Sequence, residues 1–215
     1  MNEERIVKYH STKDSHISLK VIEGHFATPH SHISHYLDMT TMKTRQNEAE
    51  RIAVAMKDYY NTMGKPIDTI VCMDGTEVIG AFLASELSKA GVLSMNAHKT
   101  IYVVSPEFDS RGLMIFRDNL KPEIKNRNVL LLLASASTGK TVRASLECIK
   151  YYGGIVQGIS SIFSAVDSVD GYNIDSLFQS SDIPDYNTYS VEECPMCKIN
   201  RKIEAIVNGH GYSLL

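Results

Sequence analysis

The sequence predicts an α/β fold, a mostly parallel twisted sheet with helices on both faces, with small N-terminal and C-terminal additions. Three observations predict this class. Short runs of apolar and β-branched residues alternate along the chain with segments whose apolar residues recur at helical spacing. A short polar loop joins each run to the helix that follows it. One run is apolar on both faces, as a central parallel strand covered by helices on each side should be.

The composition fits one main domain. The chain has 215 residues, of which 43% are hydrophobic and 22% charged, which excludes collagen-like and disordered classes. We expect an N-terminal extension or hood over residues 1–46, a core over residues 47–170 and a C-terminal segment over residues 171–215.

Charge and hydropathy limit the partners. Lys and Arg number 22 against 25 Asp and Glu, a net charge of −3 with no dense basic stripe, so we expect no nucleic-acid partner. No window approaches the roughly 18 consecutive apolar residues of a membrane span, and the N-terminus is polar. We therefore expect no membrane partner and a cytoplasmic location.

The first half of the chain predicts an extension followed by one strand–turn–helix unit. The stretch to about Asp38 mixes short apolar runs with His-rich turns and is expected to be irregular or to contain strands. Asn47 offers an N-cap for a helix that Gly64 ends. The apolar run over residues 67–73 predicts a strand, and the turn over residues 74–76 leads from it into a second helix.

The second half predicts three more strands. Residues 100–104 form one candidate, and the polar stretch over residues 105–112 predicts a surface loop. Residues 128–133 are the strand that is apolar on both faces, and residues 155–166 are the last candidate. In a parallel sheet of this kind, small ligands bind at the carboxyl ends of the strands.

The loop after the central strand carries the clearest chemistry. It lies where a strand turns into a helix, so unpaired backbone N–H groups and the positive end of the helix dipole face one small volume. Its hydroxyls add donors and its lysine adds a positive charge. We predict a phosphate-binding loop made of Ser135, Ala136, Ser137, Thr138, Gly139, Lys140 and Thr141. The alternative, that these residues only cap the helix, stays open.

A P-loop is one interpretation of this segment. That pattern requires Gly, four residues, then Gly-Lys and Ser or Thr. Gly139, Lys140 and Thr141 match it, but Ala134 stands where the first Gly should lie. Without that glycine the backbone lacks the freedom to wrap a phosphate. A P-loop-like nucleotide hydrolase is therefore the second alternative function.

The order of the motifs resembles the type I phosphoribosyltransferases, and most closely their orotate branch. Residues 129–141 are similar to the strand and loop that hold the 5-phosphate of phosphoribosyl pyrophosphate. Residues 31–38 are similar to a Ser-containing stretch of the orotate enzymes, and residues 68–80 resemble the strand and loop that approach the pyrophosphate. The resemblance implies the type I phosphoribosyltransferase fold, Mg²⁺, a homodimer, and transfer of phosphoribosyl to a pyrimidine-type nucleobase in nucleotide metabolism.

The resemblance also implies roles for individual residues. Leu133 and Ala134 stand where the family has an acidic pair that accepts hydrogen bonds from the ribose hydroxyls. In the segment that corresponds to the mobile loop of the family, Arg111 is the only cation. Asp74, at the carboxyl end of a predicted strand, is the acid nearest to the expected site. These two residues are the catalytic candidates. The loop on the pyrophosphate side would consist of Met73, Asp74, Gly75 and Thr76. The missing acids make a catalytically inactive nucleotide- or sugar-phosphate-binding regulatory module the first alternative.

Four side chains form a candidate metal site. Cys194 and Cys197 have the spacing of half a tetrahedral Zn²⁺ site. His30 and His32 project to one side of an extended segment, so they are candidates to complete it. The alternative is a reduced thiol pair.

Overall fold

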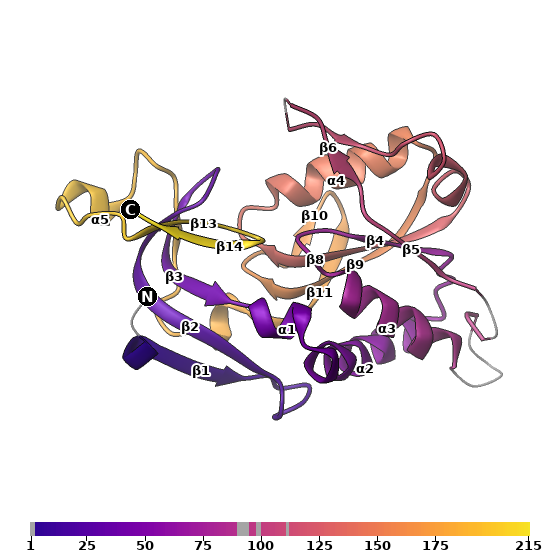
Figure 1. Ribbon diagram of the computed structural model, residues 1–215, viewed down its shortest axis with the longest axis horizontal. Helices are drawn as coiled ribbons and strands as arrows, with labels where there is room; N and C mark the ends of the chain where they lie inside the picture. The colour runs from indigo at the N-terminus through magenta and orange to yellow at the C-terminus, as the bar shows by residue number, and fades with distance from the viewer. Residues whose placement is uncertain (1–2, 90–94, 98–99, 111) are drawn as a thin grey trace.

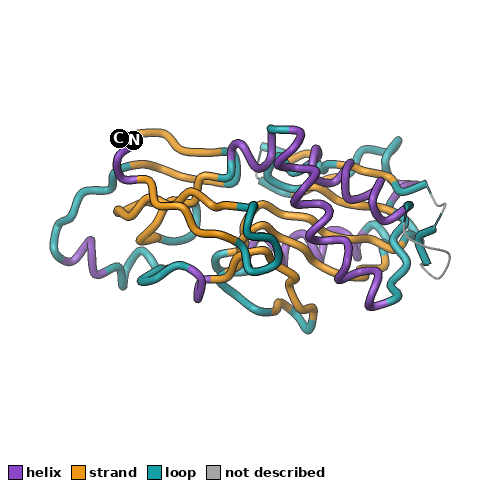
Figure 2. Tube along the Cα trace, turned by 90° about the horizontal axis from the view of Figure 1, so that it is seen from below, coloured by secondary structure: helices purple, strands orange, loops and turns teal. Residues whose placement is uncertain are grey.

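Two β-sheets organise the chain (Figure 1). The computed structural model describes residues 3–89, 95–97, 100–110 and 112–215. Both sheets have six strands, and the long helices pack on the sheet formed by the middle of the chain. Both chain ends belong to the second sheet, which lies at the end of the molecule away from the long helices (Figure 2). Within the described residues, no helix has the length and hydropathy that crossing a bilayer requires.

The core sheet is the parallel sheet that the sequence predicts. Its strand order is β10-β11-β9-β8-β4-β5, and every neighbouring pair is parallel except β10 with β11. The strands are β4 (Thr69–Cys72), β5 (Tyr102–Val104), β8 (Asn128–Ala136), β9 (Ile155–Ser164), β10 (Ser168–Val169) and β11 (Tyr172–Gln179).

Helices cover both faces of this sheet because side chains alternate along each strand. Along β8, Leu130, Leu132 and Ala134 pack with α2 (Gln46–Met63) and α3 (Glu77–Ser88). The alternate positions of β8 pack with α4 (Lys140–Tyr151) on the opposite face. All of these side chains are almost fully buried, which explains why the sequence of β8 is apolar on both faces.

The second sheet, called the hood here, combines both ends of the chain. Its order is β12-β3-β2-β13-β14, with β1 paired to β2. Its strands are β1 (Ile6–His10), β2 (Ser18–Ala27), β3 (His32–Asp38), β12 (Thr188–Tyr189), β13 (Ala205–Asn208) and β14 (Gly211–Leu214). The expected division at residue 170 therefore differs from the observed one, because β11 belongs to the core while β12 to β14 complete the hood.

Several element boundaries also differ from the sequence expectations. The helix expected from an Asn47 cap begins at Gln46, directly after a separate short helix, α1 (Thr40–Thr44). Gly64 does end α2, in the left-handed conformation with φ of 60°. Within the expected surface loop lies β6 (Glu107–Phe108), which pairs with β7 (Met114–Ile115) just after the loop. Short helical turns complete the chain: η1 (Glu3–Arg5), η2 (Lys121–Glu123), η3 (Ser180–Asp182) and α5 (Pro195–Lys198).

Candidate functional site

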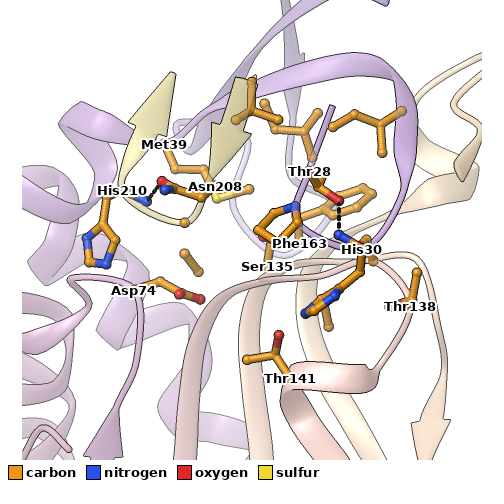
Figure 3. A pocket seen from close by; sticks show the side chains of 18 of the residues that line it. Thr28, His30, Met39, Asp74, Ser135, Thr138, Thr141, Phe163, Asn208 and His210 are labelled. Carbon is orange, nitrogen blue, oxygen red and sulfur yellow. Dashed lines mark hydrogen bonds between the residues drawn. The ribbon is translucent and has the colours of Figure 1, made fainter. Parts of the chain in front are cut away.

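A cavity of about 210 Å³ lies where the carboxyl ends of β4 and β8 face the hood (Figure 3). The core contributes Asp74, residues 134–142 and Phe163. The hood contributes residues from β3, from the segment before it and from the β13–β14 turn. The cavity thus lies at the edge where parallel α/β sheets bind ligands.

The predicted phosphate loop forms one wall of the cavity, and all seven of its residues line it. Strand β8 extends through Ala136, which pairs with Ser164, so the loop itself is only residues 137–139. A P-loop would have to leave the strand at Ala134, and this pairing prevents it. The P-loop interpretation is therefore wrong.

The backbone of this loop is open to a ligand. Helix α4 starts at Lys140, so its first N–H groups have no partner within the helix. Nothing in the described part of the chain accepts a hydrogen bond from the N–H groups of residues 138–142. These donors and the helix dipole form a site suited to a phosphate.

Gly139 is required at the turn into α4 for two reasons. Its φ is 73°, in the left-handed region that residues with a side chain rarely adopt. A Cβ at this position would also lie 2.8 Å from Cγ2 of Val169. The glycine therefore fixes the direction in which the loop amides point.

An acid from another strand end, Asp74, lies near the positions where the family has its acidic pair. Leu133 and Ala134 are buried in the two cores, on opposite faces of β8. The backbone N–H of Ala134 instead faces the carboxylate of Asp74 and lowers its pKa. Asp74 is the only acid among the described residues that line the cavity, and Figure 3 shows it and Thr141 pointing toward the same space.

The Asp74 carboxylate lies in a balanced electrostatic environment. Burial raises its pKa above the ordinary value, and Glu77 adds to this. Lys43, His210 and the Ala134 N–H act in the opposite direction. The net effect is a pKa above the usual range, so the ionised form is held at an energetic disadvantage.

Lys43 joins three segments beneath the cavity. Its ammonium group donates hydrogen bonds to the backbone carbonyls of Asp74, at 2.8 Å, and of Gly209. The residue is only 6% exposed, and burial lowers its pKa against the opposing effect of nearby acids. A Cβ at Gly209 would lie 2.4 Å from Cγ of Asp74, so the β13–β14 turn packs directly on that carboxyl group.

Aromatic side chains line the cavity beside the phosphate loop. Phe163 and Tyr186 both line the cavity, with ring centroids 4.9 Å apart. Tyr36 lines it from β3, and burial, as the largest cause, raises its pKa to about 12. Its hydroxyl is therefore neutral at physiological pH. Such aromatic side chains suit a flat ring attached to the group that the loop binds.

The other predicted site residues divide into three groups. Met73, Gly75 and Thr76 belong to the turn after β4 but do not line the cavity; the Thr76 hydroxyl donates to the Met73 carbonyl oxygen at 2.8 Å. His30 lines the cavity rather than lying among the sulfur ligands. Arg111 lies outside the described residues.

The cysteine pair meets a different histidine set from the predicted one. The structure groups Cys194 and Cys197 with His32, as expected, but with His25 in place of His30. His25 lies on β2 and His32 on β3, two antiparallel neighbours in the hood. The spacing of His30 and His32 could not reveal this, because the second histidine comes from another strand.

Three residues that line the cavity are not among those that the sequence predicts: Lys43, Tyr186 and His210. His210 lies in the β13–β14 turn. An available signal was Asn208-Gly209 after a short apolar run, since an Asn-Gly pair is typical of a tight hairpin turn. No local pattern places Lys43 or Tyr186 at the cavity.

Sequence comparisons identify two kinds of relative. No protein-family model matches the chain. The chain is 26% identical over 194 residues to orotate phosphoribosyltransferase of Caldicellulosiruptor bescii, covering 86% of this chain and 92% of the relative. It is 29% identical over 158 residues to adenine phosphoribosyltransferase of Halothermothrix orenii, covering 67% of this chain and 88% of the relative.

Solved structures share the fold. Adenine phosphoribosyltransferase from Thermoanaerobacter pseudethanolicus matches with a TM-score of 0.52 and 17% identity, over 82% of this chain and 96% of that one. Orotate phosphoribosyltransferase from Mycobacterium tuberculosis H37Rv, in complex with inorganic phosphate, matches with a TM-score of 0.50 and 13% identity, over 69% of this chain and 80% of that one.

Proposed function

The chain is a member of the type I phosphoribosyltransferase family, and from this premise we propose that it transfers phosphoribosyl from phosphoribosyl pyrophosphate to a pyrimidine-type base. The orotate relative supports a pyrimidine as the acceptor base, since its alignment covers most of this chain. The adenine relative makes a purine the competing acceptor.

One observation carries this proposal. An open anion-binding loop and the aromatic rings of Phe163 and Tyr186 line a single cavity. A ligand with a phosphate at one end and a flat ring at the other can contact both groups of residues. Phosphoribosyl transfer brings together such a pair, a sugar phosphate and a base.

The residues around the cavity have distinct roles in this proposal. The amides of residues 138–142, with Lys140 and Thr141, bind the 5-phosphate. Asp74 accepts hydrogen bonds from the ribose hydroxyls, in the place of the absent acidic pair. Lys43 is a positioning residue, since it holds the Asp74 turn against the β13–β14 turn. A nitrogen of the base attacks C1 of the ribose as pyrophosphate leaves, so orientation and charge stabilisation are the main tasks.

The family also implies Mg²⁺. Asp74 is the single carboxylate among the described lining residues, so this chain would supply at most one acidic ligand. Such a site fits Mg²⁺ only if the substrate oxygens and water provide the other ligands, which is common for this ion. Bound there, the ion would neutralise charge on the departing pyrophosphate.

A catalytically inactive sensor of nucleotides or sugar phosphates is the competing function. The observation that favours it is the burial of Leu133 and Ala134, which leaves no side-chain acid on β8 for the ribose. A sensor needs the open loop but not the acid, so activity separates the two functions.

The decisive experiment combines turnover and binding. Purified protein is mixed with phosphoribosyl pyrophosphate, Mg²⁺ and, in separate reactions, orotate, uracil or adenine, while pyrophosphate release is followed. We expect base-dependent release with a pyrimidine. Release with adenine alone would overturn the pyrimidine assignment. Binding of phosphoribosyl pyrophosphate without turnover with any base would establish the sensor instead.

A homodimer is part of the same proposal, since the orotate resemblance implies a site formed between subunits. Light scattering coupled to size-exclusion chromatography measures the mass directly. A mass of 24.0 kDa, that of one chain, at assay concentration would contradict the dimer.

A further inference from the structure

Four side chains from three segments converge in the hood, in a cluster separate from the residues that line the cavity. They are His25 on β2, His32 on β3, Cys194 at the start of α5 and Cys197 within α5. Their four ligand atoms all lie within 4.8 Å of one another. His25, His32 and Cys194 are buried, and Cys197 is partly exposed.

The spacing of these atoms matches a tetrahedral metal site. With Zn–N near 2.0–2.1 Å and Zn–S near 2.3 Å, tetrahedral geometry places two nitrogens about 3.3 Å apart and a nitrogen and a sulfur about 3.5 Å apart. His25 Nε2 lies 3.0 Å from His32 Nδ1. Cys194 Sγ and Cys197 Sγ lie 3.5 and 3.6 Å from His25 Nε2, and Cys197 Sγ lies 3.2 Å from His32 Nδ1.

The tautomer of His25 supports a metal at the centre. Its Nδ1 lies 2.8 Å from the backbone carbonyl oxygen of Arg201, which can only accept a hydrogen bond. Nδ1 therefore carries the proton in the neutral ring, and Nε2 presents a lone pair to the cluster. One lone pair cannot satisfy three close neighbours, whereas a cation in their midst is bound by all four atoms. A hydrogen bond from the other ring nitrogen to a carbonyl is also the usual support of a metal-bound histidine.

We propose that His25, His32, Cys194 and Cys197 form a structural Zn²⁺ site. Two thiolates balance the charge of the ion, and two sulfurs with two nitrogens in tetrahedral arrangement favour Zn²⁺ over harder ions. All four positions are taken by protein, so the site leaves no position for substrate. The inference does not depend on the proposed transferase activity.

The metal would fasten the C-terminal segment to the hood next to the cavity. Just after the cluster, the Glu204 N–H donates to the His25 carbonyl oxygen at 2.8 Å, and Ala205 pairs with Phe26. This pairing starts β13, whose turn with β14 lines the cavity. Fixing residues 194–201 to β2 and β3 therefore fixes the position of that turn.

Metal analysis tests the site directly. Protein purified with added zinc and dialysed should contain one Zn²⁺ per chain by elemental analysis. Replacement by Co²⁺ should give the visible absorption of tetrahedral cobalt with thiolate ligands. Cys194→Ser should weaken zinc binding by more than about a hundredfold, beyond the loss expected for a supporting residue. Cys148→Ser, a free cysteine outside the cluster, and His30→Ala should each retain one Zn²⁺.

Chelation of the wild-type protein provides a second measurement if Cys194→Ser does not fold. Removing zinc should increase hydrogen exchange in β13 and β14 while β8 and β9 stay protected. The proposal is overturned if the zinc-supplemented protein holds no stoichiometric metal, or if Cys194 and Cys197 are recovered as a disulfide under reducing conditions. Loss of zinc in His30→Ala would also overturn this set of ligands.

Discussion

The ends of β8 and β4, adjacent parallel strands, differ in what satisfies their backbone groups. After β8, the N–H groups of residues 138–142 have no acceptor within the described chain. After β4, the Thr76 hydroxyl donates to the carbonyls of Met73 and Leu132, and Lys43 donates to the Asp74 carbonyl. The first end is open to an anion, while much of the second is closed by the protein itself. Neighbouring ends of one sheet thus differ in whether their backbone groups are left for a ligand or bonded within the protein.

Substitution of Gly139 should have the largest effect, because it acts at the open end. Gly139→Asp places a negative charge against the phosphate site; at about 4–5 Å this costs roughly 3–4 kcal/mol. We expect the affinity for inorganic phosphate and phosphoribosyl pyrophosphate to fall more than about a hundredfold by calorimetry. Gly139→Asn is the matched control, since it has the same shape without the charge. Equal affinities of the two variants would show that charge at this loop is irrelevant.

Substitution of Asp74 should separate binding from catalysis. Asp74→Asn removes a charge-assisted acceptor worth about 1.5–3 kcal/mol, so kcat/KM for phosphoribosyl pyrophosphate should fall about 10- to 100-fold. Phosphate affinity should rise, because a nearby negative charge is gone. Asp58→Asn, the same change at an exposed position of α2, controls for net charge. Unchanged turnover in Asp74→Asn would contradict the proposed role of Asp74 in binding the ribose.

Lys43→Met tests the contribution of the bonded turn after β4 to the free energy of unfolding. The change leaves two partly buried carbonyls without this donor, which costs about 1–3 kcal/mol of unfolding free energy, measured in urea. Lys57→Met is the control, since Lys57 pairs with Glu86 at 2.9 Å near the surface, and such pairs contribute about 1 kcal/mol or less. A Lys43 variant no less stable than the Lys57 variant would show that the β4 end does not depend on this lysine.

The smallest expected effect is a pH dependence. Burial raises the pKa of Asp74, so above the ordinary carboxyl pKa the folded chain binds more protons at this site than the unfolded chain. The stability that Asp74 contributes is therefore present at acid pH and declines as the pH rises through the folded pKa. Relative to wild type, Asp74→Asn should be more stable at neutral pH than at about pH 4 in urea titrations. The opposite trend would contradict a raised pKa.

Sequence patterns predicted the strands and helices of the core well because the signals that define a strand, a turn or a helix start are local in the chain. The alternation along β8, the Gly139 turn and the start of α4 are all contained within residues 128–151. The phosphate loop could be predicted for the same reason, since a helix N-terminus and its preceding turn are neighbours in sequence. Only the loop length was overestimated, because pairing with β9 extends β8 to Ala136.

The hood and the second wall of the cavity could not be predicted in this way. Tyr186 meets Phe163 through β12, a two-residue strand paired with β3 across more than 150 positions of sequence. His25 joins the cysteines only because β2 and β3 are antiparallel neighbours and the C-terminal segment returns to them. Periodicity records which face of a strand is apolar, but not which distant strand becomes its neighbour.

The sequence alone therefore determined the alternating α/β core, the position of the predicted phosphate loop and the presence of a cysteine pair with metal-ligand spacing. The tertiary structure decided that Asp74 lies beside Ala134 at the cavity, that Lys43 bonds the turn after β4, and that His25 lies with His32 and the two cysteines. The physical reason is that turns and helix starts are set by neighbouring residues. Burial and the meeting of distant side chains are set by strand pairing, which the chain specifies only when it is folded as a whole.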